Sequence, residues 1–253
     1  MGQLAGKHAL ITGGGTGIGA AIAKALSGEG AAVSLAGRRR EPLEQAAARL
    51  PKAAAIIADV TDPQSCAEMA AQARNAHGPI DIVVANAGAA ESSSAGKIKR
   101  EQWQRMIDVN LSGAFYTAQA ALADVTRNDA AGRIVFIAST AGLKGYPYVA
   151  AYCAAKHGVV GLMRALAAEF GGKGVTVNAV CPGYTDTPLL EASVANITTK
   201  TGRSAEQARA ALAKDNESGR LITPEEVAAK VLWLCSPAGV STNGEAILVT
   251  GAP

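Results

Sequence analysis

The chain has 253 residues, of which 49% are hydrophobic and 18% are charged, and it carries a formal net charge of +3. Basic residues are scattered apart from a run at 38–40, and no aromatic side chains alternate with them, which argues against a protein that binds nucleic acid. No segment reaches the ~18 consecutive apolar residues of a membrane-spanning helix, so we expect no membrane association.

The four cysteines lie far apart, without a CxxC pair and without histidines at metal-ligand spacing. This pattern predicts free thiols and no metal site. The first residues, MGQLAGKHALITGGG, lack the long apolar segment of a signal peptide. We therefore expect a cytoplasmic protein.

Seven short runs rich in Val, Ile and Ala predict β-strands, at 7–12, 31–37, 53–60, 80–88, 132–139, 174–183 and 246–250. Several of them are continuously apolar rather than alternating, which is typical of strands buried on both faces. Helix-length segments lie between them, at 18–27, 63–77, 101–127, 152–170 and 224–235. This alternation predicts an α/β protein with a doubly wound Rossmann fold, in which helices cover both faces of a parallel seven-stranded sheet.

Two predicted helices begin with strong start signals. Asp62 precedes Pro63 and Thr223 precedes Pro224. In each pair the first residue is a preferred N-cap and the proline suits the first helical position.

No linker, repeat or low-complexity block divides the chain, so we expect one domain over residues 1–253. The least regular part is about 184–221, with a polar helical pattern at 193–215. Because it follows the end of a strand, where α/β proteins carry long functional insertions, we expect it to be a substrate lid.

The first strand runs into the sequence TGGGTGIG and then directly into a helix. Glycines in this order let the backbone turn tightly and let a pyrophosphate approach the amides, while the helix N-terminus adds positive partial charge. A tight turn that merely contains glycine is the alternative interpretation. The loop predicts a dinucleotide site that contains Thr12, Gly13, Gly15, Thr16, Gly17, Ile18 and Gly19.

The end of the second predicted strand is where NAD-binding folds place an acidic residue on the ribose 2′-hydroxyl. Gly37 occupies that place here, and Arg38 and Arg39 follow it. A guanidinium can bind a 2′-phosphate through two charge-assisted hydrogen bonds, and no carboxylate repels the phosphate. The segment favours NADP (NADPH), leaves NAD possible, and argues against an S-adenosylmethionine enzyme. A solvated basic turn is the alternative interpretation.

Five further motifs follow in order: NAG at 86–88, VNLSG at 109–113, IAST at 137–140, YCAAK at 152–156 and CPGYTDTP at 181–188. Together with the glycine loop, they resemble the short-chain dehydrogenase/reductase family over nearly the whole chain. The resemblance implies that Ser139 bonds the substrate carbonyl and that Tyr152 is the general acid/base. It also implies that Lys156 bonds the nicotinamide ribose. Asn110 matches an asparagine that interrupts a helix and holds a water in a proton relay.

The same resemblance implies cofactor contacts beyond the glycine loop. They are Asp59, Val60, Asn86, Ala87, Gly88, Tyr152, Lys156, Pro182, Gly183, Thr185 and Thr187.

The sequence departs from the family pattern in two places. Ala85 replaces the first Asn of the usual NNAG, and TGAP at 250–253 replaces a terminal DGG.

The chemistry can also be argued from the residues alone. Hydride that reaches a carbonyl carbon leaves charge on the oxygen, so the site needs a hydrogen-bond donor and a proton donor aimed at that atom. Ser139 can be the first and Tyr152 the second. A free tyrosine has a pKa near 10, and we expect the ammonium of Lys156, four residues further along a helix, to favour the ionised phenol.

Within the family, the motifs look most like polyketide ketoreductases, 3-oxoacyl-thioester reductases and D-3-hydroxybutyrate dehydrogenases. We therefore expect NADPH-dependent reduction of a 3-oxoacyl or related ketone, in a pocket lined by 89–94, 143–149, Tyr184 and the lid. The alternatives are an NAD-dependent 3-hydroxybutyrate-like or aryl-alcohol dehydrogenase, a non-catalytic NADP-binding regulator, and an epimerase or dehydratase of the extended family. The small residues of the 152–170 helix suit close packing across a subunit interface, and members of the family are commonly tetramers, so we expect a homotetramer.

Overall fold

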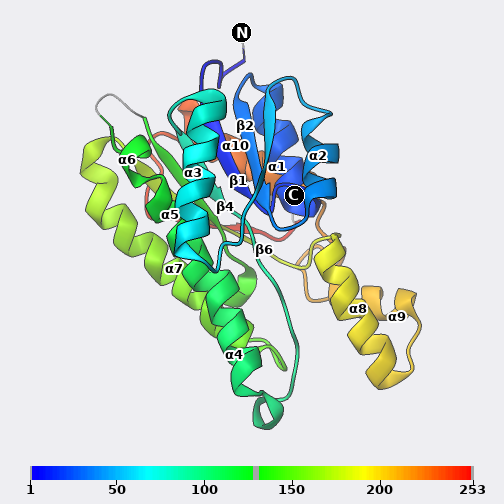
Figure 1. Cartoon of the computed structure of the whole chain (residues 1–253). Helices are drawn as coiled ribbons and strands as arrows, with labels where there is room; N and C mark the ends of the chain where they lie inside the picture. Colours follow the sequence, from blue (N-terminus) through cyan, green and yellow to red (C-terminus); the bar gives the residue numbers. More distant parts are fainter. Residues whose placement is uncertain (1, 128–130, 252–253) are drawn as a thin grey trace.

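The computed structural model describes residues 2–127 and 131–251, and its architecture is a single twisted sheet flanked by helices (Figure 1). Within these residues, seven strands pair in the order β3-β2-β1-β4-β5-β6-β7, and every pairing is parallel. The predicted doubly wound, seven-stranded parallel sheet is therefore confirmed. The strands are β1 (His8–Thr12), β2 (Ala32–Gly37), β3 (Ala53–Ile57), β4 (Ile82–Ala85), β5 (Arg133–Ile137), β6 (Thr176–Pro182) and β7 (Ala246–Val249).

Two apolar clusters, one on each face, hold the helices against the sheet. One face carries α1 (Gly17–Gly28), α2 (Arg40–Ala47) and α10 (Pro224–Cys235). The other carries α3 (Pro63–His77), α5 (Gly113–Ala120) and α7 (Ala150–Phe170). Every residue of β1, β4, β5 and β6 is buried, which explains why these strands read as continuous apolar runs.

The predicted helices at 63–77 and 224–235 occur with those bounds as α3 and α10. The Asp62 side chain accepts a hydrogen bond from the Gln64 amide at 2.9 Å. Thr223 and Glu226 cap each other reciprocally at the start of α10. Local capping chemistry therefore determines where these two helices begin.

The helix-length segment at 101–127 is interrupted at Asn110, as the resemblance implies, and is divided further along the chain. The segment consists of α4 (Arg100–Ile107), a π-helical turn (Asp108–Ser112), α5 and the short α6 (Leu122–Val125). The break has a tertiary cause, because the Asn110 side chain bonds the backbone of Ala89 and also donates to Met106 O at 3.0 Å. Such side-chain competition for backbone groups is typical of π-bulges at functional sites.

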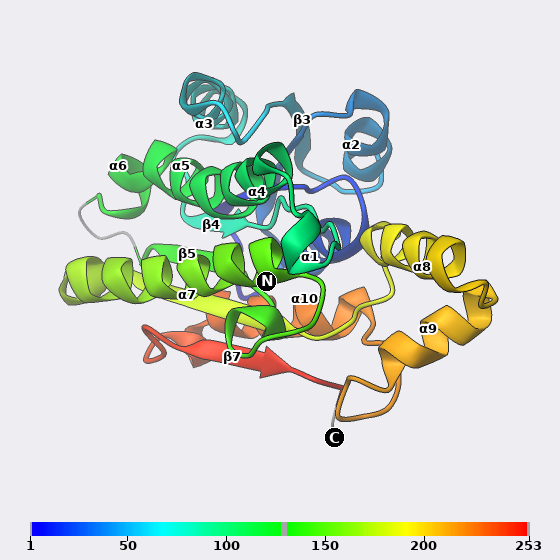
Figure 2. The ribbon, with the colours of Figure 1, turned by 90° about the horizontal axis from the view of Figure 1, so that it is seen from below.

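The insertion between β6 and α10 contains two helices, where the sequence predicts one helical pattern at 193–215. They are α8 (Pro188–Thr201) and α9 (Ala205–Ala213), separated by Gly202 with φ +70°. Figures 1 and 2 show this pair projecting beyond the carboxyl ends of the strands. We refer to residues 184–221 as the lid.

The remaining regular segments are short 3₁₀ turns, at Ala95–Lys97, Thr140–Gly142, Gly171–Lys173 and Pro237–Gly239. In the described part of the chain, no helix is both long enough and apolar enough to span a bilayer.

Candidate active site

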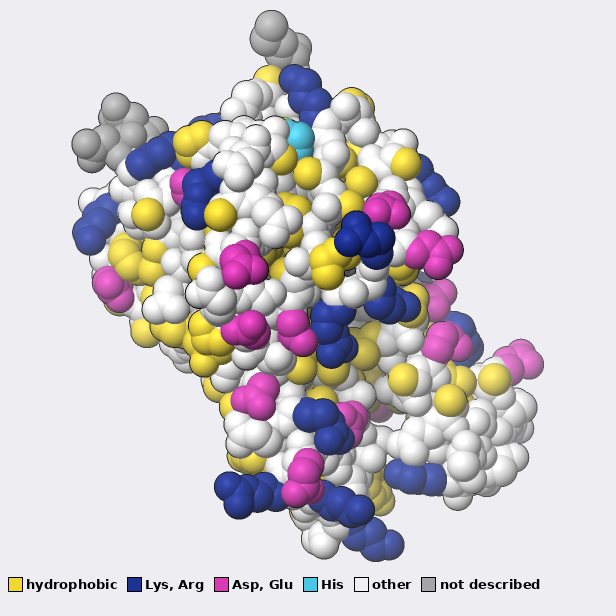
Figure 3. Space-filling view, in the orientation of Figure 1, with side chains coloured by type: hydrophobic (Ala, Val, Ile, Leu, Met, Phe, Trp, Pro, Cys, Tyr) yellow, Lys and Arg dark blue, Asp and Glu magenta, His cyan; other side chains and the backbone are white. Residues whose placement is uncertain are grey.

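A cavity of about 590 Å³ opens at the carboxyl ends of the strands, between the sheet and the lid. Figure 3 shows a hollow where the lid meets the body of the molecule, with basic side chains gathered above it. The following predicted residues line the cavity: Gly13, Gly15, Thr16, Gly17, Ile18, Arg38, Arg39, Asp59, Val60, Asn86, Ala87, Gly88, Asn110, Ser139, Tyr152, Lys156, Pro182, Gly183, Thr185 and Thr187.

Thr12 and Gly19, also predicted as cofactor contacts, lie behind the cavity wall. The Thr12 hydroxyl accepts hydrogen bonds from the amides of Asn86 at 3.1 Å and Ala87 at 3.2 Å, so it joins the glycine loop to the end of β4. A Cβ at Gly19 would lie 2.2 Å from Gly13 O. Both residues therefore shape the loop from behind.

The glycine loop forms a concave cradle at the start of α1. Gly13 and Gly17 have φ values of +64° and +52°, which side chains with a Cβ rarely adopt. The N-cap of α1 is Thr16, whose side chain makes no capping hydrogen bond, so the first amides of the helix remain as donors. A loop with open amides at a helix N-terminus fits the pyrophosphate of a dinucleotide.

The opposite wall brings Ser139, Tyr152 and Lys156 together from β5 and α7. Lys156 is 4% exposed; its Nζ donates to Ile137 O at 2.8 Å and lies 5.7 Å from the centre of the Tyr152 ring. The Ser139 hydroxyl accepts from the Ala141 amide at 3.1 Å. The i, i+4 spacing on α7 therefore places phenol and ammonium on one face, as expected.

The electrostatics of the pair differ from the expectation. Burial raises the pKa of Tyr152 to about 12, and a hydrogen bond with Ser139 opposes this only in part. Burial also lowers the pKa of Lys156 to about 8. Burial therefore outweighs the expected lowering of the phenol pKa by the ammonium, whose Nζ donates to Ile137 O.

Asn110 connects the π-helical turn to the loop after β4. It is 1% exposed, its Oδ1 accepts from the Ala89 amide at 3.2 Å, and its Nδ2 donates to Ala89 O at 2.9 Å. A Cβ at Gly88 would lie 2.9 Å from Asn110 Oδ1 and 3.8 Å from Lys156 Nζ. Because this packing leaves no room for a side chain, the backbone of Gly88 itself forms part of the cavity wall.

The far end of the cavity carries the arginines. Arg38 and Arg39 follow β2 and line the cavity beside Asp59. The Thr61 amide and hydroxyl donate to the Asp59 carboxylate at 3.0 and 2.8 Å, and the amide bond is the largest cause of its lowered pKa. β2 ends at Gly37, so the strand places no acidic side chain next to Arg38 and Arg39.

Pro42 and Leu43 of α2 are among the lining residues of this wall that sequence reasoning missed. A Cβ at Gly15 would lie 3.0 Å from Leu43 N, so the glycine loop and α2 pack directly against each other. No local signal could have identified them, since this contact joins segments that are distant in sequence.

The expected substrate end of the cavity contains aromatic side chains, as the sequence predicts. Tyr146 and Tyr184 pack edge to face with their ring centres 6.1 Å apart, and the Tyr146 hydroxyl donates to Thr140 Oγ1 at 2.9 Å. Leu190 and Ile197 of the lid line the same end. Among the described residues, no three His, Cys, Asp or Glu side chains are grouped so as to hold a metal ion.

A doubly wound parallel sheet whose glycine loop opens into a cavity at the carboxyl ends of its strands defines a dinucleotide-binding α/β protein. Comparison with known proteins narrows the class. The family model described as short chain dehydrogenase matches residues 7–198. The chain belongs to the short-chain dehydrogenase/reductase family.

Its relatives cover nearly the whole chain. A D-beta-hydroxybutyrate dehydrogenase of Cupriavidus necator is 37% identical over 96% of this chain and 95% of its own length. A putative ketoacyl reductase of Streptomyces coelicolor is 35% identical, with 96% and 95% covered. A crystal structure of a variant of actinorhodin polyketide ketoreductase with NADPH is similar with a TM-score of 0.93, 33% identity, and 99% and 98% covered.

These findings bear out the predicted enzyme class. The protein is an oxidoreductase of a family that acts on CH–OH groups with NAD(P).

Proposed function

We propose that this enzyme uses NADPH to reduce a ketone to a secondary alcohol, and that the ketone is a 3-oxoacyl thioester or a related neutral compound. One observation carries the proposal. A single cavity joins two arginines at its dinucleotide end to Ser139, Tyr152 and Lys156 in its middle and to a substrate end walled by Tyr146 and Tyr184, where no described lining residue is cationic.

The residues that would hold the cofactor fit its parts. The glycine loop suits the pyrophosphate, Arg38 and Arg39 suit the 2′-phosphate, and Asp59 with Val60 suits the adenine. Asn86 to Gly88, Lys156 and the segment from Pro182 to Thr187 suit the nicotinamide half. When bound, the cofactor supplies the hydride.

The chain's own residues manage the charge and the proton. The Ser139 hydroxyl donates a hydrogen bond to the substrate carbonyl oxygen, and the Tyr152 hydroxyl delivers the proton to that oxygen as charge develops. Lys156 holds a ribose hydroxyl and supports the tyrosinate left behind, and Asn110 supports the water through which the proton is replaced. The burial of Lys156 and Asn110 strengthens the interactions of these two side chains.

The preference for NADPH rests on charge. Arg38 and Arg39 line the cavity and Gly37 leaves the end of β2 without a carboxylate. The ketoreductase of similar structure was crystallised with NADPH. Replacing Arg38 with Ala removes a charge-assisted contact, so we expect KM for NADPH to rise by about 10- to 100-fold while KM for NADH stays within about twofold. Equal changes in both constants would contradict the assignment.

The substrate class follows from the charges that line the cavity. Among the described residues that line it, the cationic side chains are Arg38, Arg39 and Lys156, and Asp215 is a lining carboxylate. Lys144 lies over the ring of Tyr146, with Nζ 5.1 Å from the ring centre, but it does not line the cavity. A small 3-oxo acid would bring a carboxylate into this largely apolar end without a cation in the cavity wall beside it, which is unfavourable. A thioester or other neutral ketone carries no such charge.

The second candidate is an NAD-dependent 3-hydroxybutyrate-like dehydrogenase, which the relative from Cupriavidus necator favours. Initial rates with acetoacetyl thioester and with free acetoacetate separate the two. We expect kcat/KM to be at least about tenfold higher for the thioester, and a preference for free acetoacetate would favour the dehydrogenase.

Three further properties belong to the same proposal. Residues 1–253 act as one domain, with 184–221 as the substrate lid. The enzyme is a homotetramer, supported by the 51% exposure of Leu248 on the edge strand β7; a monomeric mass in solution would refute it. It works in the cytoplasm, supported by four free, buried cysteines.

A further inference from the structure

Asn216 is a buried polar side chain that neither lines the cavity nor takes part in the proposed chemistry. It is 5% exposed and lies where the lid returns to the body after α9. The Tyr184 amide donates to its Oδ1 at 2.9 Å. Its Nδ2 donates to Tyr184 O at 2.9 Å and to Arg220 O at 2.7 Å. One amide group therefore joins the outgoing and the returning ends of the lid.

The two ends are also joined by backbone hydrogen bonds. The Ile222 amide donates to Tyr184 O at 2.9 Å, and the Asp186 amide donates to Ile222 O at 2.9 Å. The Asn216 side chain extends this short ladder as an added peptide group would. A Cβ at Gly183 would lie 2.2 Å from Asn216 Oδ1, so the amide packs directly on the backbone that enters the lid.

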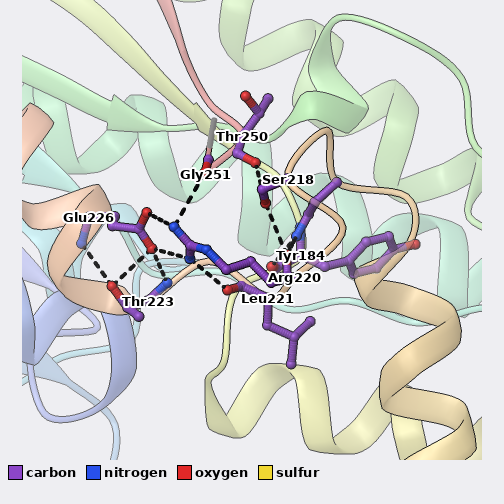
Figure 4. Close-up of polar contacts among 9 residues, drawn as sticks. Tyr184, Ser218, Arg220, Leu221, Thr223, Glu226, Thr250 and Gly251 are labelled. Carbon is purple, nitrogen blue, oxygen red and sulfur yellow. Dashed lines mark hydrogen bonds and ion pairs between the residues drawn. The ribbon is translucent and has the colours of Figure 1, made fainter. Parts of the chain in front are cut away.

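The turn that carries Asn216 is anchored from its far side (Figure 4). Arg220 forms two hydrogen bonds with the Glu226 carboxylate, at 2.8 and 2.6 Å, and a third with Gly251 O at 3.3 Å. Ser218 Oγ donates to Thr250 O at 3.0 Å. Gly251 has φ +72°, and a Cβ there would lie 2.7 Å from Ser218 Oγ.

This network explains a feature that the sequence leaves open, the unusual ending that starts at Thr250. Its described residues, Thr250 and Gly251, contact the base of the lid; residues 252 and 253 lie outside the described part of the chain. Glu226 of α10 and the segment after β7 thus hold the turn at residues 216–220 in place. Asn216 of this turn bonds the backbone of Tyr184.

Tyr184 is the first residue of the lid, and its side chain lines the cavity. Its ring packs edge to face on Tyr146, and the residue also packs against the apolar cluster of the lid helices, which includes Leu190 and Leu212. The preceding Pro182 carbonyl accepts from Ser139 Oγ at 3.5 Å. A shift of the Tyr184 backbone would therefore move the substrate wall beside the residue proposed to bind the carbonyl. The glycine loop meets the lid further on, where a Cβ at Gly17 would lie 3.2 Å from the Thr187 side chain.

We propose that Asn216 is a positioning residue for the substrate side of the site, and that Arg220 fixes the turn from which it acts. Its amide holds the two ends of the lid at one spacing and so sets the place of the Tyr184 wall. This inference rests on the proposed function for its kinetic consequence, whereas its structural consequence is independent of any substrate.

Hydrogen exchange tests the structural part. Asn216→Ala removes three hydrogen bonds, so we expect the amides of Tyr184 and Ile222 to exchange at least about tenfold faster. Asn178→Ala is the matched control. Asn178 is 1% exposed, accepts from the Glu245 amide at 3.0 Å and donates to Thr242 O at 2.8 Å, away from the lid. Unchanged exchange at Tyr184 in the Asn216 variant would overturn the proposal.

Kinetics test the functional part. Loss of the three buried hydrogen bonds at the lid should raise KM for the ketone in Asn216→Ala by a factor of about 5 to 30. KM for NADPH should rise by a smaller factor, about two to five, because the segment from Pro182 to Thr187 also belongs to the proposed cofactor site. In Asn178→Ala, both constants should stay within about twofold. If KM for NADPH rose by as large a factor as KM for the ketone, or if the two variants behaved alike, Asn216 would have only a general structural role.

Arg220→Gln is a second test of the proposal. The variant should fold normally, because the Arg220 side chain is half exposed. It should raise KM for the ketone in the same direction by a smaller factor, about two to five. An unchanged KM would overturn the part assigned to Arg220. A wild-type enzyme that reduces no ketone would refute the proposed function, and the exchange rates would still decide the role of Asn216 in the lid.

Discussion

Replacing Lys156 with Met should stabilise the cofactor-free enzyme while it abolishes turnover. Burial lowers the pKa of Lys156 from its usual 10.5 to about 8, so the folded protein holds the ammonium at a cost. At about 1.4 kcal/mol per pKa unit, this drop corresponds to about 3 kcal/mol at pH 7. The variant also loses the hydrogen bond to Ile137 O, which costs about 1 kcal/mol of stability. The net increase in the free energy of unfolding is therefore about 2 kcal/mol.

The sign of this gain depends on pH in a defined way. Below pH 8 the lysine is charged in both the folded and the unfolded protein, so the full cost is present. Between pH 8 and 10.5 the folded protein loses the proton first, so the wild type gains stability relative to the Met variant. Above that range only the lost hydrogen bond remains, and the variant should be the less stable protein.

Thermal and urea unfolding at pH 7 and pH 10 measure this difference. For a chain of this size, a gain of about 2 kcal/mol raises Tm by about 4 to 8 °C. Lys230→Met, on the exposed face of α10, is the control and should change stability by less than about 0.5 kcal/mol. A Lys156→Met protein that is less stable at pH 7, or whose advantage is the same at both pH values, would refute the reasoning.

Three further changes test other parts of the site and fold. Tyr152→Phe should lower kcat by about 100- to 10,000-fold and leave NADPH binding nearly intact in a fluorescence titration, since only the proton donor is lost; a variant with most of its activity would sink the assignment. Gly19→Ala should lose NADPH binding and about 1–3 kcal/mol of stability, because its Cβ would lie 2.2 Å from Gly13 O. Gly28→Ala on the same helix meets no atom within 4 Å and should bind NADPH normally, so similar losses in both variants would argue against a specific clash. Asp62→Ala should cost about 1 kcal/mol in urea unfolding by removing the cap on the Gln64 amide, and Asp62→Asn should restore most of it.

The strands and most helices could be predicted because their signals are local. Continuous apolar runs marked the buried strands, and Asp62 with Pro63 marked the start of α3. The alternation of strands and helices predicted a parallel doubly wound sheet, whereas the order of its strands comes from the structure. The residues of the candidate site could be named because their motifs resemble those of the family. Strand ends and the i, i+4 spacing on α7 explain why these residues lie on one side of the sheet.

The features that could not be predicted depend on contacts between distant segments. The resemblance implied an interruption at Asn110 within the 101–127 pattern, but its physical cause, the bonds between Asn110 and Ala89, 21 residues earlier, is visible only in the structure. The high pKa of Tyr152 depends on burial that no spacing reveals. Asn216 looked like one more polar residue of a lid, because the backbone that it bonds, at Tyr184, lies 32 residues away in the sequence.

The central claim is that this enzyme reduces a neutral ketone with NADPH. Initial rates with acetoacetyl thioester, measured with NADPH and with NADH at matched concentrations, test it most directly. The account predicts a kcat/KM for the NADPH reaction at least about tenfold above that for NADH, because the charge-assisted contacts of Arg38 and Arg39 require the 2′-phosphate. Equal or faster reduction with NADH, or no reduction of the ketone with either cofactor, would contradict it.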